Sequence, residues 1–336
     1  MVGILLCTQN VYAAQPMHSA KAAVIYDADY GQVLYEHNGN APMLIASTTK
    51  IMTAVVALEQ CDTQELVTAT AEMANVEGSS MYLQKGKEYT LKELLYGLML
   101  ASGNDAATAI AVHVAGDTEA FAALMNQKAA ELGLGNTHFE NPHGLDGAAH
   151  YSTAMDMARL MAYAMGNSAF AEIVGTRSAT IHGITYVNHN KLLWQCEGVI
   201  GGKTGYTKAA GRTLVTCCER EGQRLICVTL SDPDDWNDHS RLYDWAYGKY
   251  ERKLLVSSET RYVLPMLRGN GSTVMAEPLR DVTVFTSDLA SVKTIVELPR
   301  FVYGPVYVGD RAGRIFVRVN GITVEEVPLV YMENKE

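Results

Sequence analysis

Apolar side chains recur with two different periods along the 336-residue chain, and the change of period predicts the fold. Two strand-like runs at residues 23–26 and 32–35 flank a turn-rich stretch, which predicts a β-hairpin. From residue 48 to about residue 164, apolar side chains return every three or four positions, as in helices packed on one face. This stretch predicts helices at residues 48–59, 91–100, 105–114, 119–132 and 153–164.

After Trp194 the apolar period becomes two. Residues 199–207, 212–218 and 223–230 then predict strands, and residues 240–250 predict a helix that packs back on their sheet. A strand hairpin, a helical middle and late strands predict a mixed α/β architecture whose sheet is built from both ends of the chain.

The last part of the chain is almost entirely strand-like, after a boundary expected near residues 251–259. Predicted strands lie at residues 282–285, 292–298, 315–319 and 323–327, and Asn320-Gly321 between the last two is a strong hairpin turn. We therefore expect a first domain over residues 16–255 and a small β-rich domain over residues 256–336.

Residues 1–15 form a segment of their own. An apolar run, Val2–Cys7, leads to small residues at Ala13 and Ala14, as at the end of an export signal. No Lys or Arg precedes Lys21, although a basic start is typical of such signals. We expect a signal-peptide remnant and an exported protein, and a frayed terminus without a targeting role is the alternative.

The composition and the net charge argue against some classes of function. The chain is 48% hydrophobic and 19% charged, which is typical of a globular protein with a sizeable core. Its formal net charge of −10 argues against nucleic acid as a partner and against broad adhesion to anionic lipid. Six cysteines without a Cys-x-x-Cys pair predict no particular disulfide.

Three short strings carry the candidate chemistry: Ser47-Thr48-Thr49-Lys50, Ser102-Gly103-Asn104 and Lys203-Thr204-Gly205. Ser47 stands where a helix is about to begin, so free backbone N–H groups lie close to it. Lys50 follows one helical turn later, which places its amine beside the serine hydroxyl. A lysine takes a proton from serine only if its pKa is lowered, and Lys203 is a second cation that favours this. The first string therefore predicts a nucleophile and its general base.

The second string lies between two predicted helices, where a loop projects side chains into a cleft. Ser102 is a candidate proton relay between Lys50 and a leaving nitrogen. Asn104 is a candidate hydrogen-bond partner of Lys50 and of a substrate amide. By itself this string is also typical of a loop whose Asn104-Asp105 caps the next helix.

The third string lies on a predicted strand. A free strand edge there pairs with an extended peptide, and Gly205 allows close approach. Lys203 and Thr204 are the candidates for holding a terminal carboxylate. The backbone N–H groups of Ser47 and Tyr206 are the candidates for an oxyanion hole.

The three strings in this order resemble those of the D-alanyl-D-alanine carboxypeptidases, which are low-molecular-mass penicillin-binding proteins. Residues 94–105, 141–154 and 203–211 are similar to further stretches of that family. The resemblance implies an α/β penicilloyl-serine transferase fold, with an antiparallel sheet flanked by helices and a helical subdomain, followed by a β-rich C-terminal domain. It implies a peptidase that removes the terminal D-alanine from peptidoglycan stem peptides through an acyl-enzyme on Ser47, with β-lactams as inhibitors. It also implies action at the outer face of the cytoplasmic membrane or in the cell wall.

Two features depart from the family pattern. Tyr206 stands where some relatives carry His. Residues 332–336 are polar and short, so the sequence does not predict the amphipathic membrane-anchoring helix that many relatives carry.

Two alternatives remain open at this stage. A serine β-lactamase starts with the same chemistry but needs a second base for deacylation, and Glu140 is in a sequence context unlike that of such a base. A catalytically silent wall-binding protein would not need all the motif side chains. We expect no cofactor and no metal, since His143, Asp146 and His150 lack a His-Glu-x-x-His pattern.

Overall fold

The computed structural model describes residues 15–268 and 272–336, so most of the predicted signal remnant lies outside the described residues. The main sheet is antiparallel, with the strand order β2-β1-β9-β8-β7. The hairpin of β1 (Ala22–Asp27) and β2 (Gln32–His37) pairs through β1 with β9 (Gln223–Leu230). β8 (Gly211–Arg220) and β7 (Val199–Thr207) follow, and β7 forms an edge. The sheet is therefore built from both chain ends, as the sequence predicted.

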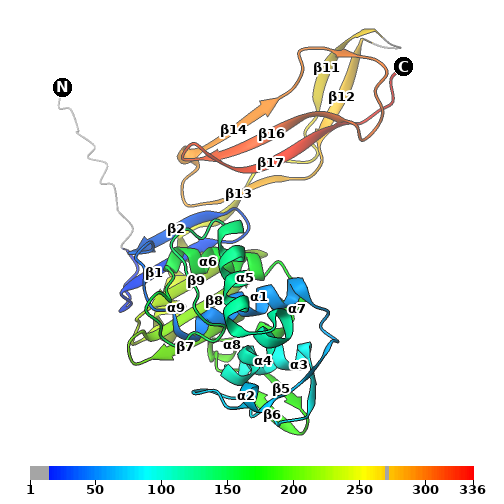
Figure 1. The fold of residues 1–336 in the computed structure, drawn as a ribbon. Helices are drawn as coiled ribbons and strands as arrows, with labels where there is room; N and C mark the ends of the chain where they lie inside the picture. The colour runs from blue at the N-terminus through cyan, green and yellow to red at the C-terminus, as the bar shows by residue number, and fades with distance from the viewer. Residues whose placement is uncertain (1–14, 269–271) are drawn as a thin grey trace, which may run out of the picture.

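Helices cover both faces of this sheet (Figure 1). The helical middle packs on one face as α1 (Lys50–Gln60), α3 (Leu91–Leu100), α4 (Asn104–Ala115), α5 (Thr118–Glu131), α6 (Ala154–Ala164) and α7 (Ser168–Gly175). The other face is covered by α9 (Asp235–Lys249), which buries Tyr243 against the strands. Because helices cover both faces, most residues of the central strands β1, β9 and β8 are buried.

Neighbouring residues of β8 show how the sheet divides the core. Val215 and Cys217 belong to the core under the helical middle, whereas Leu214 and Cys218 belong to the core under α9. Successive side chains of a strand point to opposite faces, so adjacent cysteines are separated by the sheet itself. The five cysteines of the described residues are all free: Cys61, Cys196, Cys217, Cys218 and Cys227.

Several elements differ from the predictions. A 3₁₀ turn, η1 (Ala46–Thr49), precedes α1, so the helix begins two residues later than predicted. α9 begins at Asp235 rather than at residue 240, because acidic side chains in its first turn favour an earlier start. The short elements were not predicted: β3 (Leu66–Thr68), α2 (Ala71–Ala74), β4 (Glu88–Thr90), β5 (Ser178–Ile181), β6 (Ile184–Val187) and α8 (Leu192–Gln195).

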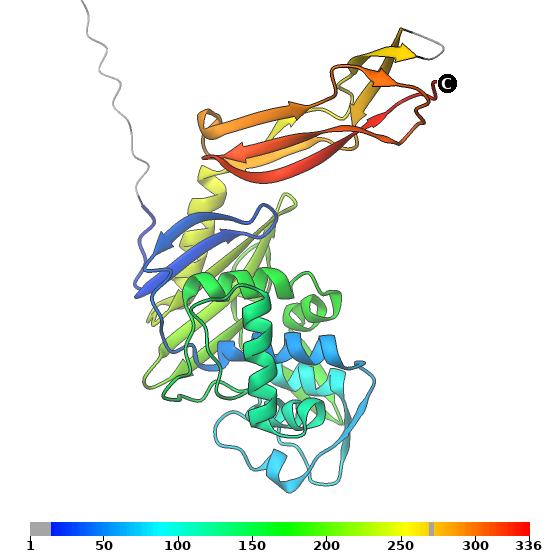
Figure 2. The ribbon, with the colours of Figure 1, turned by 45° about the horizontal axis from the view of Figure 1, so that its top comes forward.

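The C-terminal part is a separate β structure with its own core (Figure 2). One sheet has the order β14-β16-β17-β12-β11-β15, and β10 pairs with β13. The bounds are β10 (Glu251–Val256), β11 (Tyr262–Arg268), β12 (Thr273–Pro278), β13 (Val282–Thr286), η2 (Leu289–Ser291), β14 (Val292–Glu297), β15 (Val302–Tyr303), β16 (Arg311–Val319) and β17 (Ile322–Tyr331). The turn between β16 and β17 has positive φ angles at Asn320 and Gly321, as its sequence predicted.

β10 lies within the interval expected to be a boundary and pairs with β13 of the C-terminal part. We therefore propose that the domains divide between α9 and β10, rather than at residue 255. Tyr250 stacks on Phe285 across this junction, with ring centroids 5.9 Å apart. Among the described residues, no helix combines the length and the apolar character needed to cross a bilayer.

Candidate active site

Ser47 and Lys50 meet at the start of α1. Ser47 lies in the 3₁₀ turn η1, half-buried, and Lys50 is the first residue of the helix and fully buried. The Lys50 Nζ lies 2.8 Å from the Ser47 Oγ. Proton transfer needs heavy atoms within about 2.6–3.2 Å, so the two groups are placed for a direct transfer.

The contacts of Lys50 can be made both by an ammonium and by an uncharged amine. Its Nζ lies 2.7 Å from the Asn104 Oδ1 and 2.7 Å from the His143 carbonyl oxygen, and both of these atoms can only accept. The Nζ donates to both of them and to the Ser47 Oγ, and once the amine is uncharged its two N–H groups satisfy the two acceptors and its lone pair faces the Ser47 hydroxyl. Burial and the charge of Lys203 lower the pKa of Lys50 well below its usual value, whereas the Asp105 charge opposes the shift. Burial is the larger cause.

Ser102 and Asn104 reach the same point from the loop between α3 and α4. Ser102 has a φ of +58°, which is unusual for a residue with a side chain and marks a strained position. Its hydroxyl accepts a hydrogen bond from the Lys203 Nζ at 3.0 Å. The Asn104 amide nitrogen donates to the Glu77 carbonyl at 2.6 Å, which fixes the amide oxygen toward Lys50.

Lys203 extends from β7 and is 1% exposed. Besides Ser102, its Nζ contacts the Thr204 carbonyl at 2.8 Å. Burial lowers the pKa of Lys203 to about 7. These two contacts bind the lysine to the motif loop and to its own strand, and carboxylate binding by Lys203 stays a prediction.

Gly205 brings β7 against the turn that carries the serine. A Cβ at this position would lie 3.0 Å from the Ser47 backbone nitrogen and 2.3 Å from the Thr213 Oγ1. The absence of a side chain therefore allows the strand edge to lie beside Ser47. Tyr206 follows, with its side chain two-thirds exposed, so the two predicted oxyanion-hole residues flank this close approach.

A cleft of about 310 Å³ opens at this point. Its lining includes the predicted residues Ser47, Ser102, Thr204, Gly205 and Tyr206, together with Ser79, His189, Arg212, Asp235 and Trp236. All eight predicted site residues are therefore brought together, either in the cleft lining or, for Lys50, Asn104 and Lys203, in direct hydrogen bonds beneath it.

Arg212 is a residue that sequence reasoning missed. It stands on β8 directly opposite Tyr206, and its guanidinium donates to the Asp235 carboxylate at 2.7 Å. The guanidinium also lies over the Trp236 ring, 5.3 Å from its centroid. The Nε of Arg212 is buried without a hydrogen-bond partner among the described residues. In the sequence, Arg212 follows the Lys203-Thr204-Gly205 string on the next predicted strand. Only the pairing of β7 with β8 shows that it lies in the cleft.

Asp105 anchors the motif loop and was expected only to cap a helix. Its buried carboxylate accepts hydrogen bonds from the Ser80 hydroxyl and from the backbone N–H groups of Met81, Leu83 and Ala106, at 2.6–3.0 Å. The loop after Gly78 is thereby tied to the start of α4, which presents Ser102 and Asn104.

The histidines set aside as metal ligands have separate partners. The His150 Nδ1 accepts from the Glu140 backbone N–H, so its Nε2–H donates to the Thr49 Oγ1 at 2.8 Å. Burial lowers the pKa of His143 and of His150 to about 4 in each case. Asp146 accepts from the Thr207 hydroxyl. These side chains support the walls of the cleft, and Glu140 is exposed rather than part of its lining.

Comparisons with known proteins agree with this geometry. The D-alanyl-D-alanine carboxypeptidase family model matches residues 9–234. The D-alanyl-D-alanine carboxypeptidase DacF of Bacillus subtilis is 32% identical over 99% of this chain and 92% of its own length. The enzyme DacC of Escherichia coli is 34% identical over 99% of this chain and 90% of its own length.

Solved structures have the same fold. Penicillin-binding protein 5 of Haemophilus influenzae superposes with a TM-score of 0.77 at 27% identity, over 96% of this chain and 99% of that chain. A Streptococcus pneumoniae penicillin-binding protein superposes with a TM-score of 0.85 at 23% identity, over 95% of this chain and all of that one, which concerns the fold alone. The chain therefore belongs to the D-alanyl-D-alanine carboxypeptidase family, with a penicilloyl-serine transferase fold followed by a β-rich domain.

Proposed function

We propose that this protein is a serine-type D-Ala-D-Ala carboxypeptidase that removes the terminal D-alanine from peptidoglycan pentapeptide stems. The observation that carries the proposal is the contact of 2.8 Å between the Lys50 Nζ and the Ser47 Oγ, with Lys50 buried and its other two contacts made to pure acceptors. An uncharged amine beside a serine hydroxyl is the arrangement that acyl transfer requires.

In the acylation step, Lys50 takes the Ser47 proton as the Oγ attacks the carbonyl of the penultimate D-alanine. The backbone N–H groups of Ser47 and Tyr206 stabilise the oxyanion, since Gly205 lets the strand edge lie close to the serine. Ser102 donates a proton to the leaving nitrogen, and the C–N bond breaks. Ser102 then recovers a proton from Lys203, which donates to its hydroxyl at 3.0 Å, and the proton that Lys50 took passes on to Lys203, so that Lys50 is again uncharged.

We assign the terminal carboxylate of the substrate to Arg212 and Thr204. Lys203 is fully buried and already donates to Ser102 and to the Thr204 carbonyl, so it acts on the carboxylate through its charge. The guanidinium of Arg212 lines the cleft, is oriented by Asp235 and keeps a buried N–H without a partner. A planar guanidinium is well suited to bind a carboxylate.

The second step is hydrolysis of the Ser47 ester by water, with Lys50 again as the base. Because β-lactams present a strained amide to the same serine, we expect penicillin to form a long-lived ester on Ser47. The peptidoglycan substrate requires a location outside the cytoplasmic membrane, as the N-terminal segment also indicates.

The test is release of D-alanine from a diacetylated Lys-D-Ala-D-Ala peptide, together with labelling by a fluorescent penicillin and peptide mapping. We expect D-alanine release and a label on Ser47, and Ser47→Ala should lose both. Fast turnover of a chromogenic cephalosporin would instead identify a β-lactamase. A folded protein that neither releases D-alanine nor takes the label would be a silent wall-binding protein.

A further inference from the structure

A cysteine, a glutamate and a histidine meet at the surface of the helical middle. The Cys61 Sγ, a carboxylate oxygen of Glu65 and a ring nitrogen of His113 all lie within 4.8 Å of one another. The Glu65 Oε2 lies 3.0 Å from the His113 Nε2, and the Cys61 thiol also hydrogen-bonds Glu65. Thiolate, imidazole and carboxylate are the three ligand types that Zn²⁺ binds in proteins. We call these three residues the Cys61 cluster.

The spacing of the ligand atoms fits a tetrahedral zinc ion. Zinc bonds of about 2.0–2.1 Å to nitrogen and oxygen place these two ligand atoms about 3.3 Å apart around a tetrahedral centre. With a zinc–sulfur bond of about 2.3 Å, the sulfur lies about 3.6 Å from each of them. The observed separations are 3.0 Å between Glu65 and His113 and at most 4.8 Å within the cluster. Small side-chain movements therefore bring the three atoms to the geometry of a zinc complex.

The backbone holds the ligands in place. Cys61 is the residue that ends α1, and His113 lies in the last turn of α4. Glu65 lies in the segment after α1, where its Oε1 accepts from the Asp62 N–H at 2.8 Å and its own N–H donates to the Asp62 carbonyl. This pair of hydrogen bonds fixes the carboxylate, so that the Oε2 is directed at His113.

The electrostatics of the cluster favour a cation. α1 and α4 pack side by side (Figure 1), and both begin at the active site, where the Lys50 Nζ lies 2.7 Å from the Asn104 Oδ1. The helices are therefore parallel, and both present the negative end of their dipole at the Cys61 cluster. A cation there relieves the repulsion between the two helix ends. A Cys61 thiolate and the Glu65 carboxylate together balance the charge of Zn²⁺.

The ligand set favours zinc over Ca²⁺ and Mg²⁺. These two ions bind oxygen ligands, whereas a thiolate with an imidazole suits Zn²⁺. Cys61 and His113 are half-buried and Glu65 is exposed, so water reaches the fourth position around the ion. The sequence analysis expected no metal, since His113 is far from Cys61 along the chain and only the packing of α4 on α1 brings the two together.

We propose that the Cys61 cluster is a zinc site that joins the C-terminal ends of α1 and α4. The ion is bound by the Cys61 Sγ, the Glu65 Oε2 and the His113 Nε2, with water as the fourth ligand. On binding, the thiol proton passes to solvent, and the neutral imidazole keeps its one ring proton on Nδ1. The two helices that carry Lys50 and Asn104 are then held together at both ends.

The ion supports the fold and takes no part in the acyl transfer. α1 has 11 residues and α4 has 12, so the site lies about 16–18 Å along the helices from Lys50 and Asn104. None of the three ligands lines the catalytic cleft. The inference is therefore independent of the proposed function, and zinc binding can be measured without any substrate.

The experiment measures zinc binding by the full chain in a phosphine reductant, after dithiothreitol and adventitious metal have been removed. Equilibrium dialysis gives the number of zinc ions per chain, and Co²⁺ in place of Zn²⁺ reports a bound thiolate through its charge-transfer absorption. Alkylation followed by peptide mapping compares Cys61 with Cys196 in the same molecule. Cys196 is the matched cysteine, since it is also half-buried and also ends a helix, α8, but lies beside the Arg220 guanidinium.

We expect one zinc ion per chain, a thiolate-to-cobalt absorption band, and protection of Cys61 but not of Cys196 from alkylation. Cys61→Ser and His113→Asn should each weaken binding more than about a hundredfold, because loss of an outer partner of a metal ligand alone costs about 10–100-fold. Zinc at about a hundred times its Kd should raise the Tm by about 5–10 °C. An excess of Ca²⁺ should change none of these results.

The matched controls are Cys196→Ser and His182→Asn, which should bind zinc like the wild type. His182 lies 3.6 Å from Glu93, and among the described residues no cysteine completes a metal-binding group with this pair. The inference is wrong if the dialysed protein holds no zinc, if zinc leaves Cys61 as reactive as before, or if Cys61→Ser and His113→Asn both bind zinc as tightly as the wild type. Protection of Cys61 is measured in the wild type, so the test stands even where a variant fails to fold.

Discussion

The buried Lys203 offers the sharpest test of the site's electrostatics. Replacing it with methionine keeps a side chain of similar length and removes the ammonium. Burial lowers the pKa of Lys203 from 10.5 to about 7, and this shift corresponds to about 5 kcal/mol of folding free energy lost below pH 7. The hydrogen bonds of Lys203 to Ser102 and to the Thr204 carbonyl each stabilise the fold by about 1 kcal/mol and so offset part of this loss. Lys203→Met should therefore stabilise the fold by about 3 kcal/mol at neutral pH.

The sign of the stability difference between Lys203→Met and the wild type depends on pH. Below pH 7 the lysine is protonated in the folded and the unfolded chain, so the cost of burying the charge is complete. Between about pH 7 and pH 10.5 the unfolded chain keeps the proton that the folded protein has lost, so wild-type stability rises with pH. The advantage of Lys203→Met should therefore shrink as pH rises, and near pH 10 the wild type should be the more stable protein.

The assay is urea unfolding followed by tryptophan fluorescence at several pH values, with Lys208→Met as an exposed control. Loss of Lys203 also removes the repulsion that lowers the pKa of Lys50, so any residual penicillin acylation should need a higher pH. The activity should fall at least a hundredfold, since Ser102 loses its partner. The reasoning fails if the variant is less stable than the wild type at neutral pH, or if their difference does not change with pH.

Three further variants test other parts of the site. Arg212→Gln should raise KM about tenfold for a peptide with a free C-terminal carboxylate but not for its amide, and an equal effect on both would exclude carboxylate binding by Arg212. Gly205→Ala should slow penicillin acylation at least tenfold, because its Cβ would lie 2.3 Å from the Thr213 Oγ1, and stopped-flow rates equal to wild type would refute this close packing. Asp105→Asn should lower the free energy of unfolding by about 2–3 kcal/mol, because a charged acceptor of four hydrogen bonds is lost, and an unchanged urea midpoint would contradict the anchoring role.

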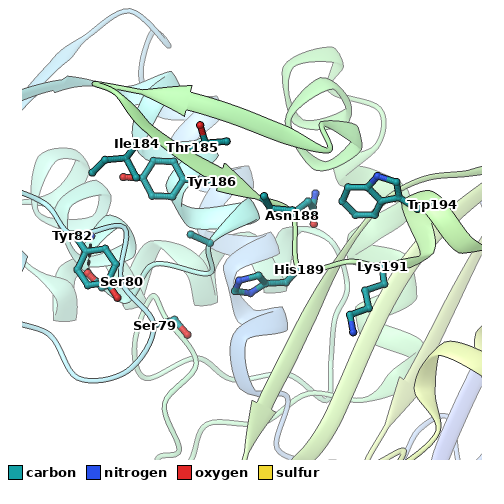
Figure 3. Close-up of a pocket in the computed structure, with 12 residues that line it drawn as sticks. Ser79, Ser80, Tyr82, Ile184, Thr185, Tyr186, Asn188, His189, Lys191 and Trp194 are labelled. Atoms are coloured by element: carbon teal, nitrogen blue, oxygen red, sulfur yellow. Dashed lines mark hydrogen bonds between the residues drawn. The ribbon is translucent and has the colours of Figure 1, made fainter.

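Local sequence patterns were sufficient where an element is long and bounded by turn residues. α3, β7 and β9 have the bounds that the sequence predicted, because each apolar run is interrupted at both ends by polar or turn-forming residues. β5 and β6 have four residues each and are mostly exposed, so they carry little apolar periodicity and were missed. Residues 184–187 of this hairpin nevertheless line a pocket of about 880 Å³ (Figure 3).

The residues of the candidate site were also predicted only in part. The three strings predicted which residues meet, because acyl transfer needs these side-chain types within one helical turn or on a strand edge. Arg212 and Asp235 were not predicted, since their meeting depends on the pairing of β7 with β8 and on the early start of α9. The anchoring role of Asp105 was also missed, because a buried acceptor of loop N–H groups looks like a helix cap in the sequence.

The three thiols of the central sheet have a practical consequence for handling the protein. Cys217 faces one layer of the interior, while Cys218 and Cys227 face the other, and all three are buried and unbridged. Burial raises the pKa of Cys218 to about 11 and that of Cys227 well above its usual value, so neither is ionised at neutral pH, and the thiolate is the form that oxidises. Residues 15–268 and 272–336 thus acquire their shape without any oxidative cross-link, and recombinant production in a reducing bacterial cytosol, with dithiothreitol in every buffer, should yield native material.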